Sequence, residues 1–420
     1  MRILILSQWF WPEPMKLLSD MAETLIELGH EVQVLTGYPN WPSGRLYPGY
    51  QIRLCQREQA GKVPVTRIPL YPDHSRSSLR RILNYTSFVA AAASLGPFVA
   101  QRPDLIHAIQ PPTTCSAAWV LGRIWRVPFT LEVQDLWPET LTATGMIGNR
   151  QVVQLVGHYC AWAYRKAAAI RVISPGFKRN LVAKGVPEQK VFHIPNWVDC
   201  DYYRPQSASR ELAVKYGLQE RFNVVYAGTV GLAQGLDTVV RAAGLLRDLE
   251  KVQLVVIGDG LDLPRLMQLA NEQKLTNVKF LGRLPMELMP QLYAVADGLL
   301  VHLKDDPLFR ITIPHKTLTY LAAGKPIVAA LEGDAADVVE MAQAGLVCRS
   351  GDPAALAATV RKLWSQPPGV RRALGHNGRE YATSHFGRNA LIAAMVEMFE
   401  FARSPAGRGS LDLVSSRSHP

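Results

Sequence analysis

Short aliphatic runs alternate with longer amphipathic runs along most of this 420-residue chain. The short runs have the length and composition of buried strands, and the longer runs repeat apolar residues with helical spacing. Such alternation is typical of βαβ units, in which helices join parallel strands. The strands expected in the first half are 3–6, 32–35, 65–68, 105–108, 129–133, 170–173 and 191–194, and those in the second half are 224–227, 254–257, 278–281, 298–303 and 327–330.

A polar stretch at about 199–210 interrupts this alternation, which then begins again. Together with the length, this predicts an α/β chain of two doubly wound, Rossmann-like domains, 1–198 and 199–386, facing each other across a cleft. An amphipathic helix at 387–403 is expected to pack on either domain, and the polar tail 404–420 is expected to be disordered. Ligands of open parallel sheets bind beyond the carboxyl ends of the strands, so the loops there hold the candidate site residues.

Composition excludes several classes of protein. With 48% hydrophobic and 19% charged residues, the chain is neither disordered nor collagenous. Its five cysteines form no Cys-x-x-Cys pair, which argues against a structural zinc or a disulfide framework and favours a reducing compartment. The start, MRILIL, has the pattern of a first buried strand and not of a signal peptide.

Positive charge is concentrated in the first half. Residues 1–199 hold 21 Lys and Arg against 13 Asp and Glu, and much of the excess falls in residues 45–81. Segment 82–100, the most apolar of the chain, follows directly and is expected as a buried or interfacial helix. Basic residues beside such a helix predict contact with an anionic membrane surface, although a solvated basic face is the alternative. Nucleic acid is not expected, because no aromatic-interleaved basic motif is present. The basic residues of this patch are Arg45, Arg53, Arg57, Lys62, Arg67, Arg76, Arg80 and Arg81.

Two aromatic loops follow strands in the first half, at 7–14 and 37–44. The first is too bulky for a dinucleotide-binding glycine loop, which argues against a nicotinamide or flavin dehydrogenase. Mixed aromatic and polar residues suit stacking on a sugar ring or a lipid, and a packed loop is the alternative. The candidate acceptor contacts are Gln8, Phe10, Glu13, Lys16, Trp41 and Gln134.

The segment QDLWPE at 134–139 follows the expected strand 129–133. Asp135 and Glu139 are the candidate catalytic carboxylates here, since a carboxylate at a strand end can accept a proton from an attacking hydroxyl. The alternative is structural, because Pro138 and Glu139 also suit the first turn of a helix.

Glycine-bearing loops follow three strands of the second half, where backbone amides can approach an anion. Segment 310–317 then opens a helix with two cations, and with the helix N-terminus these can hold a diphosphate and stabilise it as it leaves. A surface lysine in a first helical turn is the alternative for Lys316. The candidate donor-binding residues are Gly228, Gly231, Gln234, Gly258, Asp259, Arg283, Arg310, His315, Lys316, Thr317 and Thr319, and Lys316 is also a candidate catalytic residue.

Four motifs in this order resemble the GT-B fold glycosyltransferases of family 4, and the resemblance extends from Met1 to about Phe401. They are GHEV at 29–32, PN-x-VD at 195–199, GDG at 258–260 and AAGKP at 322–326. Within that family, YPNWP-x-G at 38–44, QDLWPE at 134–139 and IP-x-K at 313–316 resemble the subgroup that builds bacterial surface polysaccharides, including colanic acid transferases and N-acetyl-L-fucosamine transferases of O-antigen.

This resemblance implies a retaining enzyme that transfers an N-acetylated amino sugar, such as N-acetyl-L-fucosamine or N-acetylglucosamine, from a UDP-sugar. The implied acceptor is an undecaprenyl-diphosphate-linked saccharide of O-antigen, capsule or exopolysaccharide synthesis. The implied location is cytoplasmic, peripheral on the inner face of the cytoplasmic membrane. No metal cofactor is expected, and Asp199 and Asp201 are interpreted as structural because they lie in the linker motif.

Several family positions carry different residues here. The two family glutamates correspond to Ile311 and Thr319, the Arg and Lys of the diphosphate clamp to Thr229 and Gln234, and the catalytic histidine to Gln134. We therefore expect Lys316, together with Arg310, to replace the clamp.

In this mechanism the donor β-phosphate takes the acceptor proton, and Asp135 and Glu139 orient the acceptor. The alternatives to a transferase are a nucleotide-sugar epimerase of the same fold and a non-catalytic membrane scaffold.

Overall fold

The computed structural model describes residues 1–75, 77–145, 148–405 and 407. These divide into two compact units: the first contains residues 1–195 together with 389–405 and 407, and the second contains residues 196–388. The boundaries drawn from the sequence pattern lie within a few residues of these. Most of the tail expected to be disordered, 406 and 408–420, lies outside the described residues.

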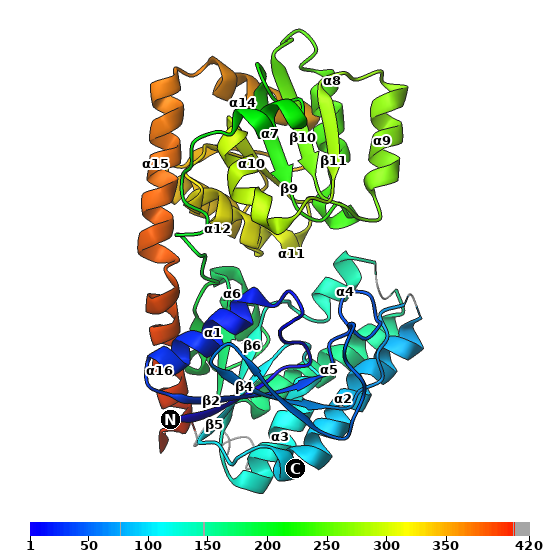
Figure 1. The fold of residues 1–420 in the computed structure, drawn as a ribbon, viewed down its shortest axis with the longest axis vertical. Helices are drawn as coiled ribbons and strands as arrows, with labels where there is room; N and C mark the ends of the chain where they lie inside the picture. The colour runs from blue at the N-terminus through cyan, green and yellow to red at the C-terminus, as the bar shows by residue number, and fades with distance from the viewer. Residues whose placement is uncertain (76, 146–147, 406, 408–420) are drawn as a thin grey trace. The chain divides into compact units, whose positions relative to one another are not determined.

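Within the described residues, the first unit is built on an eight-stranded sheet of order β3-β4-β2-β1-β5-β6-β7-β8 (Figure 1). All neighbouring strands pair in parallel except β3, which runs antiparallel to β4 at the edge of the sheet. The central strands are buried, as expected for parallel strands covered on both faces. The strands are β1 (Arg2–Leu6), β2 (Glu31–Gly37), β3 (Gln56–Ala60), β4 (Val63–Ile68), β5 (Leu105–Ile109), β6 (Phe129–Val133), β7 (Ala169–Val172) and β8 (Val191–His193).

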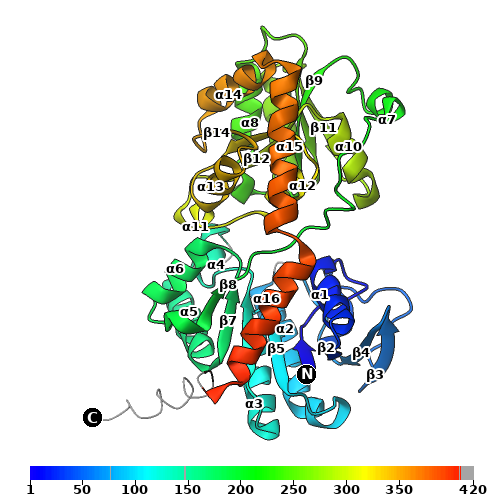
Figure 2. The same ribbon diagram turned by 90° about the vertical axis from the view of Figure 1, so that its left-hand side faces the viewer.

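Helices cover both faces of this sheet. Helices α2, α3 and α5 lie on one face, and α1 and the C-terminal helix α16 lie on the other (Figures 1 and 2). The ring of Phe399 in α16 lies 5.1 Å from that of His107 in β5, so the end of the chain completes the first unit. The helices are α1 (Lys16–Glu27), α2 (Ser78–Val99), α3 (Thr114–Trp125), α4 (Glu139–Ala143), α5 (Arg150–Lys166), α6 (Pro175–Ala183), the 3-10 helix η1 (Glu188–Lys190) and α16 (Arg388–Arg403).

Helix α2 corresponds to the apolar segment predicted at 82–100. By length and composition alone, residues 79–99 are sufficient to cross a membrane. In the structure, however, Asn84, Phe88, Ala92 and Gly96 are buried on one side of the helix. A Cβ on Gly96 would come within 2.9 Å of a methyl carbon of Leu121 in α3, so the two helices pack closely. The helix therefore covers the sheet, and its opposite side is exposed.

The basic residues at 45–81 do not form one exposed patch, contrary to the sequence-based interpretation. The Arg67 side chain is fully buried, pairs with Glu58 at 2.5 Å and donates to the carbonyl oxygens of Gly37 and Trp11. Arg57 and Lys62 are also engaged, with the carbonyl of Val99 and the carboxylate of Glu27 respectively. Arg80 and Arg81 belong to α2, and Arg76 lies outside the described residues.

The second unit is built on a parallel six-stranded sheet of order β11-β10-β9-β12-β13-β14 within the described residues. The chain passes from β9 to β10 on one side and later to β12 on the other, so the order reverses between β9 and β12. Such a switch point is where open α/β sheets bind ligands. The strands are β9 (Phe222–Ala227), β10 (Val252–Ile257), β11 (Val278–Gly282), β12 (Gly298–His302), β13 (Ile327–Ala330) and β14 (Gly345–Cys348).

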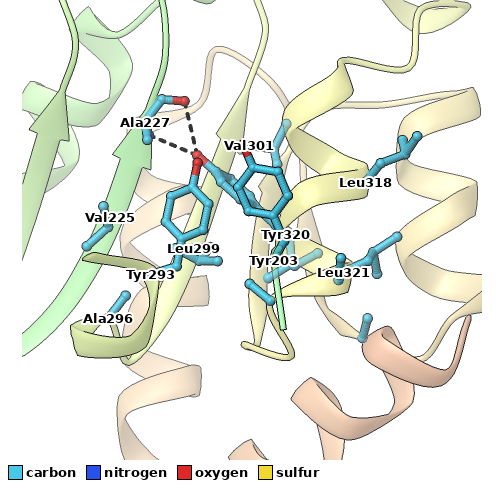
Figure 3. Packing of buried hydrophobic residues seen from close by; sticks show 14 of the residues in the cluster. Tyr203, Val225, Ala227, Tyr293, Ala296, Leu299, Val301, Leu318, Tyr320 and Leu321 are labelled. Carbon is cyan, nitrogen blue, oxygen red and sulfur yellow. Dashed lines mark hydrogen bonds between the residues drawn. The ribbon is translucent and has the colours of Figure 1, made fainter. Parts of the chain in front are cut away.

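Side chains of these strands alternate between two buried clusters, one on each face of the sheet. In the first cluster, the hydroxyl of Tyr320 in α12 donates to the carbonyl of Ala227 (3.2 Å) and accepts its N–H (2.8 Å), as Figure 3 shows. This residue fixes α12 against the carboxyl end of β9. The helices are α7 (Arg210–Lys215), α8 (Asp237–Gly244), α9 (Leu263–Glu272), α10 (Met289–Val295), α11 (Pro307–Arg310), α12 (His315–Ala322), α13 (Asp334–Met341), α14 (Pro353–Ser365), α15 (Pro368–His385), and the 3-10 helices η2 (Leu232–Gln234) and η3 (Met286–Leu288).

The predicted fold class, two doubly wound α/β domains, is confirmed, and each predicted strand is present. Two strands were not predicted. β3 was missed because its sequence, QREQA, is polar, and an edge strand needs no apolar face. β14 was missed because it is only four residues long.

Candidate active site

The loops after β9 and β10 are in direct backbone contact. Gly228 N–H donates to Ile257 O at 2.9 Å, and Val230 N–H donates to Asp259 O at 2.9 Å. Gly258 has a φ of +141°, and a Cβ there would lie 1.8 Å from the carbonyl oxygen of Gly228. These glycines are therefore required by the packing of the two loops on each other, whereas the sequence alone suggested only an approaching ligand.

Lys316 occupies the first turn of α12, and its amine lies beside the end of β9. A Cβ on Gly228 would lie 2.6 Å from Lys316 Nζ, so a larger residue at 228 would displace the amine from this position. Nζ also lies 3.7 Å from the centroid of the Tyr226 ring, which the Tyr226 hydroxyl holds in place by donating to Thr229 O. The lysine predicted from its strand-to-helix position thus lies at the switch point of the sheet.

The Lys316 amine is buried and makes no hydrogen bond with any described residue. Burial lowers the pKa of this amine from 10.5 to about 7. The face of an aromatic ring attracts a cation but satisfies none of its N–H donors. A buried ammonium without an acceptor is costly, and an anion placed beside it would remove that cost.

His302, at the end of β12, was not identified from the sequence. Its ring is fully buried, Nδ1 lies 2.6 Å from the carbonyl oxygen of Gln234, and Nε2 has no hydrogen-bond partner among the described residues. Burial lowers the pKa of this ring to about 4, so it is neutral at pH 7. Tyr226 was also missed, and for both residues the available signal was their place at the ends of strands on either side of the switch point.

Arg310 does not have the environment expected of a diphosphate clamp. Its half-exposed guanidinium lies 2.9 Å from Asp305 and 3.0 Å from Glu332, so two carboxylates already balance its charge. The expectation that Arg310 supplies free positive charge is not supported by these contacts.

The other donor candidates have varied surroundings. Gln234 Oε1 accepts the N–H of Gly231 at 3.1 Å, which closes their loop, and Asp259 and Arg283 are exposed at strand ends. On α12, His315 is exposed with Nε2 3.1 Å from Trp197 O, Thr317 Oγ1 is buried without a hydrogen-bond partner among the described residues, and Thr319 Oγ1 donates to Lys316 O.

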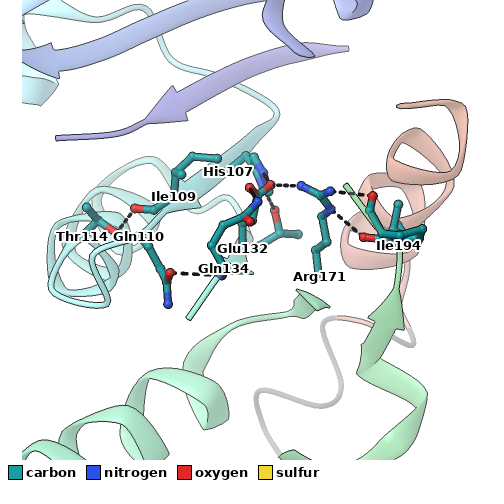
Figure 4. A network of polar contacts seen from close by, with 10 residues as sticks. His107, Ile109, Gln110, Thr114, Glu132, Gln134, Arg171 and Ile194 are labelled. Atoms are coloured by element: carbon teal, nitrogen blue, oxygen red, sulfur yellow. Dashed lines mark hydrogen bonds and ion pairs between the residues drawn. The ribbon is translucent and has the colours of Figure 1, made fainter. Parts of the chain in front are cut away.

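At the carboxyl end of the first sheet, Glu132 is the centre of a buried polar network (Figure 4). Its carboxylate lies 2.6 Å from Arg171 Nη1 and 3.3 Å from His107 Nε2, and it accepts the amide of Gln134 at 2.6 Å. Burial alone would raise the pKa of Glu132, but Arg171 and His107 hold it well below its usual range. Arg171 also donates to the carbonyls of Ile194 and Pro195.

Gln110, which sequence reasoning did not identify, fixes the loop that carries Asp135. Its Oε1 accepts the N–H groups of Gln134 (3.1 Å) and Asp135 (2.7 Å), and its Nε2 donates to Asp135 O at 2.5 Å. Asp135 is an exposed residue, and desolvation of its carboxyl by the surrounding protein raises the pKa. A rigid loop with a solvent-accessible carboxylate suits a group that binds a substrate.

Glu139 begins α4 and pairs through Oε1 with Lys184. Its Oε2 is buried and has no hydrogen-bond partner among the described residues. One of the two predicted catalytic carboxylates, Glu139, is thus paired with a lysine, whereas Asp135 has no ion pair with the residues that the structure describes.

Glu13 serves the packing of the aromatic loops. Its carboxylate accepts the backbone N–H groups of Phe10 (2.9 Å), Asn40 (2.9 Å) and Trp41 (2.8 Å), and so joins the loops after β1 and β2. Burial raises the pKa of Glu13 to about 6, although these hydrogen bonds oppose the shift. These contacts favour the packed-loop interpretation for this residue.

The remaining acceptor candidates divide by exposure. Phe10 is fully buried, and Gln8 is buried and donates to Asn84 at 2.6 Å, so neither presents a free side chain. Trp41 is partly exposed, and Lys16 is exposed, with its amine 3.2 Å from Asp20.

The residues described by the structure contain no group of three or more His, Cys, Asp or Glu placed to hold a metal ion. In the linker motif, Asp199 accepts the N–H of Tyr202 at 2.9 Å, which is a turn contact. Metal independence remains a prediction.

Both units match known protein families. Residues 16–197 match the Glycosyl transferase 4-like domain, and residues 209–381 match Glycosyl transferases group 1. The crystal structure of Anabaena HepE in complex with UDP and glucose has a similar fold, with a TM-score of 0.71 and 20% identity over 95% of this chain and 99% of that one. These findings define a two-domain glycosyltransferase with the GT-B fold.

Two curated relatives extend this comparison. WcaI of Escherichia coli K12, a glycosyl transferase named for colanic acid biosynthesis, is 28% identical over 87% of this chain and 91% of its own length. A GDP-mannose-dependent phosphatidylinositol monomannoside mannosyltransferase of Mycobacterium tuberculosis is 30% identical over 59% of this chain and 69% of its own length. The chain belongs to glycosyltransferase family 4, as its motifs indicated.

Proposed function

We propose that this glycosyltransferase moves an N-acetylated amino sugar from a UDP-sugar to an undecaprenyl-diphosphate-linked saccharide, with retention of the anomeric configuration and without a metal ion. The observation that carries the proposal is the Lys316 amine, buried at the switch point of the second sheet with no hydrogen-bond partner among the described residues. A diphosphate supplies the anionic acceptors that such an amine lacks.

The donor diphosphate is placed beside Gly228 and Lys316 at the end of β9. Ionised, Lys316 balances the charge that grows on the diphosphate as the sugar leaves, and the N-terminus of α12 adds a positive dipole. Because Tyr320 fixes α12 to Ala227, the amine is held in position before the donor binds. Such preorganisation stabilises a leaving group more effectively than a mobile surface lysine.

The acceptor is placed at the carboxyl end of the first sheet, where the exposed Asp135 carboxylate orients its hydroxyl. The acceptor proton passes to the departing β-phosphate, so Asp135 acts by positioning. Substitution of Asp135 should then lower turnover more than donor affinity.

The relatives support the substrate classes of this proposal. WcaI is named for the synthesis of a surface polysaccharide, HepE was crystallised with UDP, and the mycobacterial relative uses a lipid acceptor by name. Because the mycobacterial relative is named for a GDP-mannose donor, the test must compare donors with different nucleotide bases. A lipid-linked acceptor places the enzyme at the inner face of the cytoplasmic membrane as a peripheral protein, acting in O-antigen, capsule or exopolysaccharide synthesis.

Calorimetric titration with UDP-, GDP- and dTDP-sugars, with and without EDTA, tests the donor site. We expect saturable binding of a UDP-linked N-acetylamino sugar that EDTA does not change. Loss of binding in EDTA with rescue by manganese would contradict metal independence, and preference for a GDP-sugar would contradict the donor base.

The transfer itself is tested with the bound donor and a saccharide diphosphate on a short polyprenyl chain. We expect stoichiometric release of UDP and a glycoside whose anomeric configuration, measured by NMR, matches that of the donor. A changed nucleotide sugar without glycoside would indicate an epimerase, and failure to bind any donor would indicate a scaffold.

A further inference from the structure

The outer side of the α2, α3 and α5 layer in the first unit exposes large apolar side chains. We call this surface the apolar helix face and define it by Leu79, Ile82 and Phe98 of α2, Ile124 of α3, and Val152 and Leu155 of α5. Leu79 is 77% exposed, Phe98 84% and Leu155 69%. These side chains reach solvent, whereas Asn84, Phe88, Ala92 and Gly96 form the buried side of α2.

These three helices also carry charge of one sign. They contain six basic residues and no Asp or Glu: Arg80, Arg81, Arg123, Arg150, Arg165 and Lys166. Helices α1 and α16, on the other face of the same sheet, contain three basic residues, Lys16, Arg388 and Arg403, and five acidic residues, Asp20, Glu23, Glu27, Glu397 and Glu400. The apolar helix face is therefore the cationic side of the first unit.

The combination identifies the kind of partner. Exposed leucine, isoleucine and phenylalanine among arginines match a lipid surface, where apolar side chains enter the acyl boundary and arginines meet phosphate headgroups. A second copy of this chain would bring two cationic faces together, which is unfavourable. A nucleic acid would use the arginines but leave the apolar side chains unexplained.

Helix α2 also connects this surface with the end of the first sheet. On its buried side, Asn84 accepts a hydrogen bond from Gln8, which follows β1. The Tyr85 ring lies 6.2 Å from Trp9 and 6.4 Å from Trp137, in the loops after β1 and β6. If the lipid of a lipid-linked saccharide lies in the bilayer, α2 lies between that lipid and the loop that carries Asp135.

We propose that the apolar helix face binds the surface of an anionic bilayer, with α2 lying along the interface and not crossing it. This inference deepens the peripheral membrane location in the proposed function and rests on it. It requires no property of the donor site, so the two can be tested separately.

Vesicle flotation of the full-length protein tests the inference. We expect binding to vesicles of phosphatidylcholine with phosphatidylglycerol, weak binding to phosphatidylcholine alone, and a decrease as salt is raised. The double variant L79E/I82E and the single variant L155E should each bind the mixed vesicles at least about tenfold more weakly. M341E is the matched control, since Met341 is 63% exposed on the second unit, and it should bind like the wild type.

Trp119 of α3 provides a local readout, because it is 36% exposed on the same helix layer. Brominated lipids should quench part of the tryptophan fluorescence of the wild type, and this part should be missing in W119F. Thermal melting of each variant without vesicles checks that the exposed substitutions leave the fold intact.

Three results would overturn the inference. They are equal binding by L79E/I82E and wild type, equal binding to neutral and anionic vesicles, and a self-associated wild type that the same variants convert to monomer. Transfer to a water-soluble acceptor analogue should be unchanged in L79E/I82E. Loss of vesicle binding with normal transfer separates this inference from the proposed function.

Discussion

Glu132 in the first unit and Lys316 in the second are both buried ionisable groups beside the carboxyl end of a parallel strand, yet their surroundings differ. Glu132 contacts Arg171, His107 and Gln134. Lys316 has the face of the Tyr226 ring and no hydrogen-bond partner among the described residues. A buried charge with a full set of partners maintains structure, whereas one without partners indicates where a ligand of opposite charge belongs.

The largest effect is expected from E132Q. Replacing this carboxylate leaves the buried Arg171 without its counter-charge, so we expect the free energy of unfolding to fall by about 3–5 kcal/mol. Urea denaturation measures the loss. The control is E27Q. Glu27 forms an exposed ion pair with Lys62 at 3.5 Å, so this variant should lose less than about 1 kcal/mol of unfolding free energy. A loss in E132Q as small as in the control would break the proposed contrast between the two sites.

K316M should weaken donor binding rather than folding. The lost charge-assisted contact corresponds to about 1.5–3 kcal/mol, or roughly a 10- to 150-fold higher Kd for the UDP-sugar. The free variant should be at least as stable as the wild type, because it removes a buried amine without a partner. Unchanged affinity together with lower stability would show that Lys316 is structural.

The same amine predicts a pH dependence. Only the ammonium form attracts the diphosphate, so donor affinity should decrease as the pH rises above about 7, and K316M should lack this dependence. Stability of the free protein should change in the opposite direction. It rises from pH 7 toward 10.5, since the unfolded lysine holds its proton more tightly than the folded one.

E13Q tests whether Glu13 is a loop anchor. The amide group of glutamine would face backbone N–H groups, so we expect a loss of about 1–3 kcal/mol at pH 7 with little change in donor affinity. Because burial raises the pKa of Glu13 from 4.5 to about 6, the proton-linked part of its contribution to stability is present below pH 4.5 and is lost as the pH rises through 6. The hydrogen bonds that the carboxylate accepts from the backbone remain at pH 7, and these are what E13Q removes. Denaturation across this range should show that slope in the wild type only.

The smallest effect is expected from R310A. Asp305 and Glu332 already balance this half-exposed guanidinium, so the donor Kd should change by less than about threefold. Titration with the same UDP-sugar used for K316M gives the direct comparison. A loss of about tenfold would place Arg310 with Lys316 in the donor site.

Much of the fold was predictable, since aliphatic runs such as that of β1 define strands wherever both faces of a sheet are covered. The edge strand β3 escaped because its residues are polar. Lys316 was identifiable from its place at a strand-to-helix turn. His302 and Tyr226 were missed, because their place near strand ends marks them only as neighbours of the switch point and does not show which side chains they meet. Glu13 was predicted to contact the acceptor, but in the structure it accepts hydrogen bonds from the loop after β2. Such bonds to a distant loop cannot be read from the sequence.

The position of α16 has a consequence for the order of events during synthesis. Its Phe399 packs against His107, which itself contacts Glu132, so the last helix completes the core around the first polar network. The residues of the second unit leave the ribosome before this helix does. The amino-terminal unit is translated first but is completed only when α16 has been made, and until then the part of its sheet around His107 that α16 covers is exposed to chaperones.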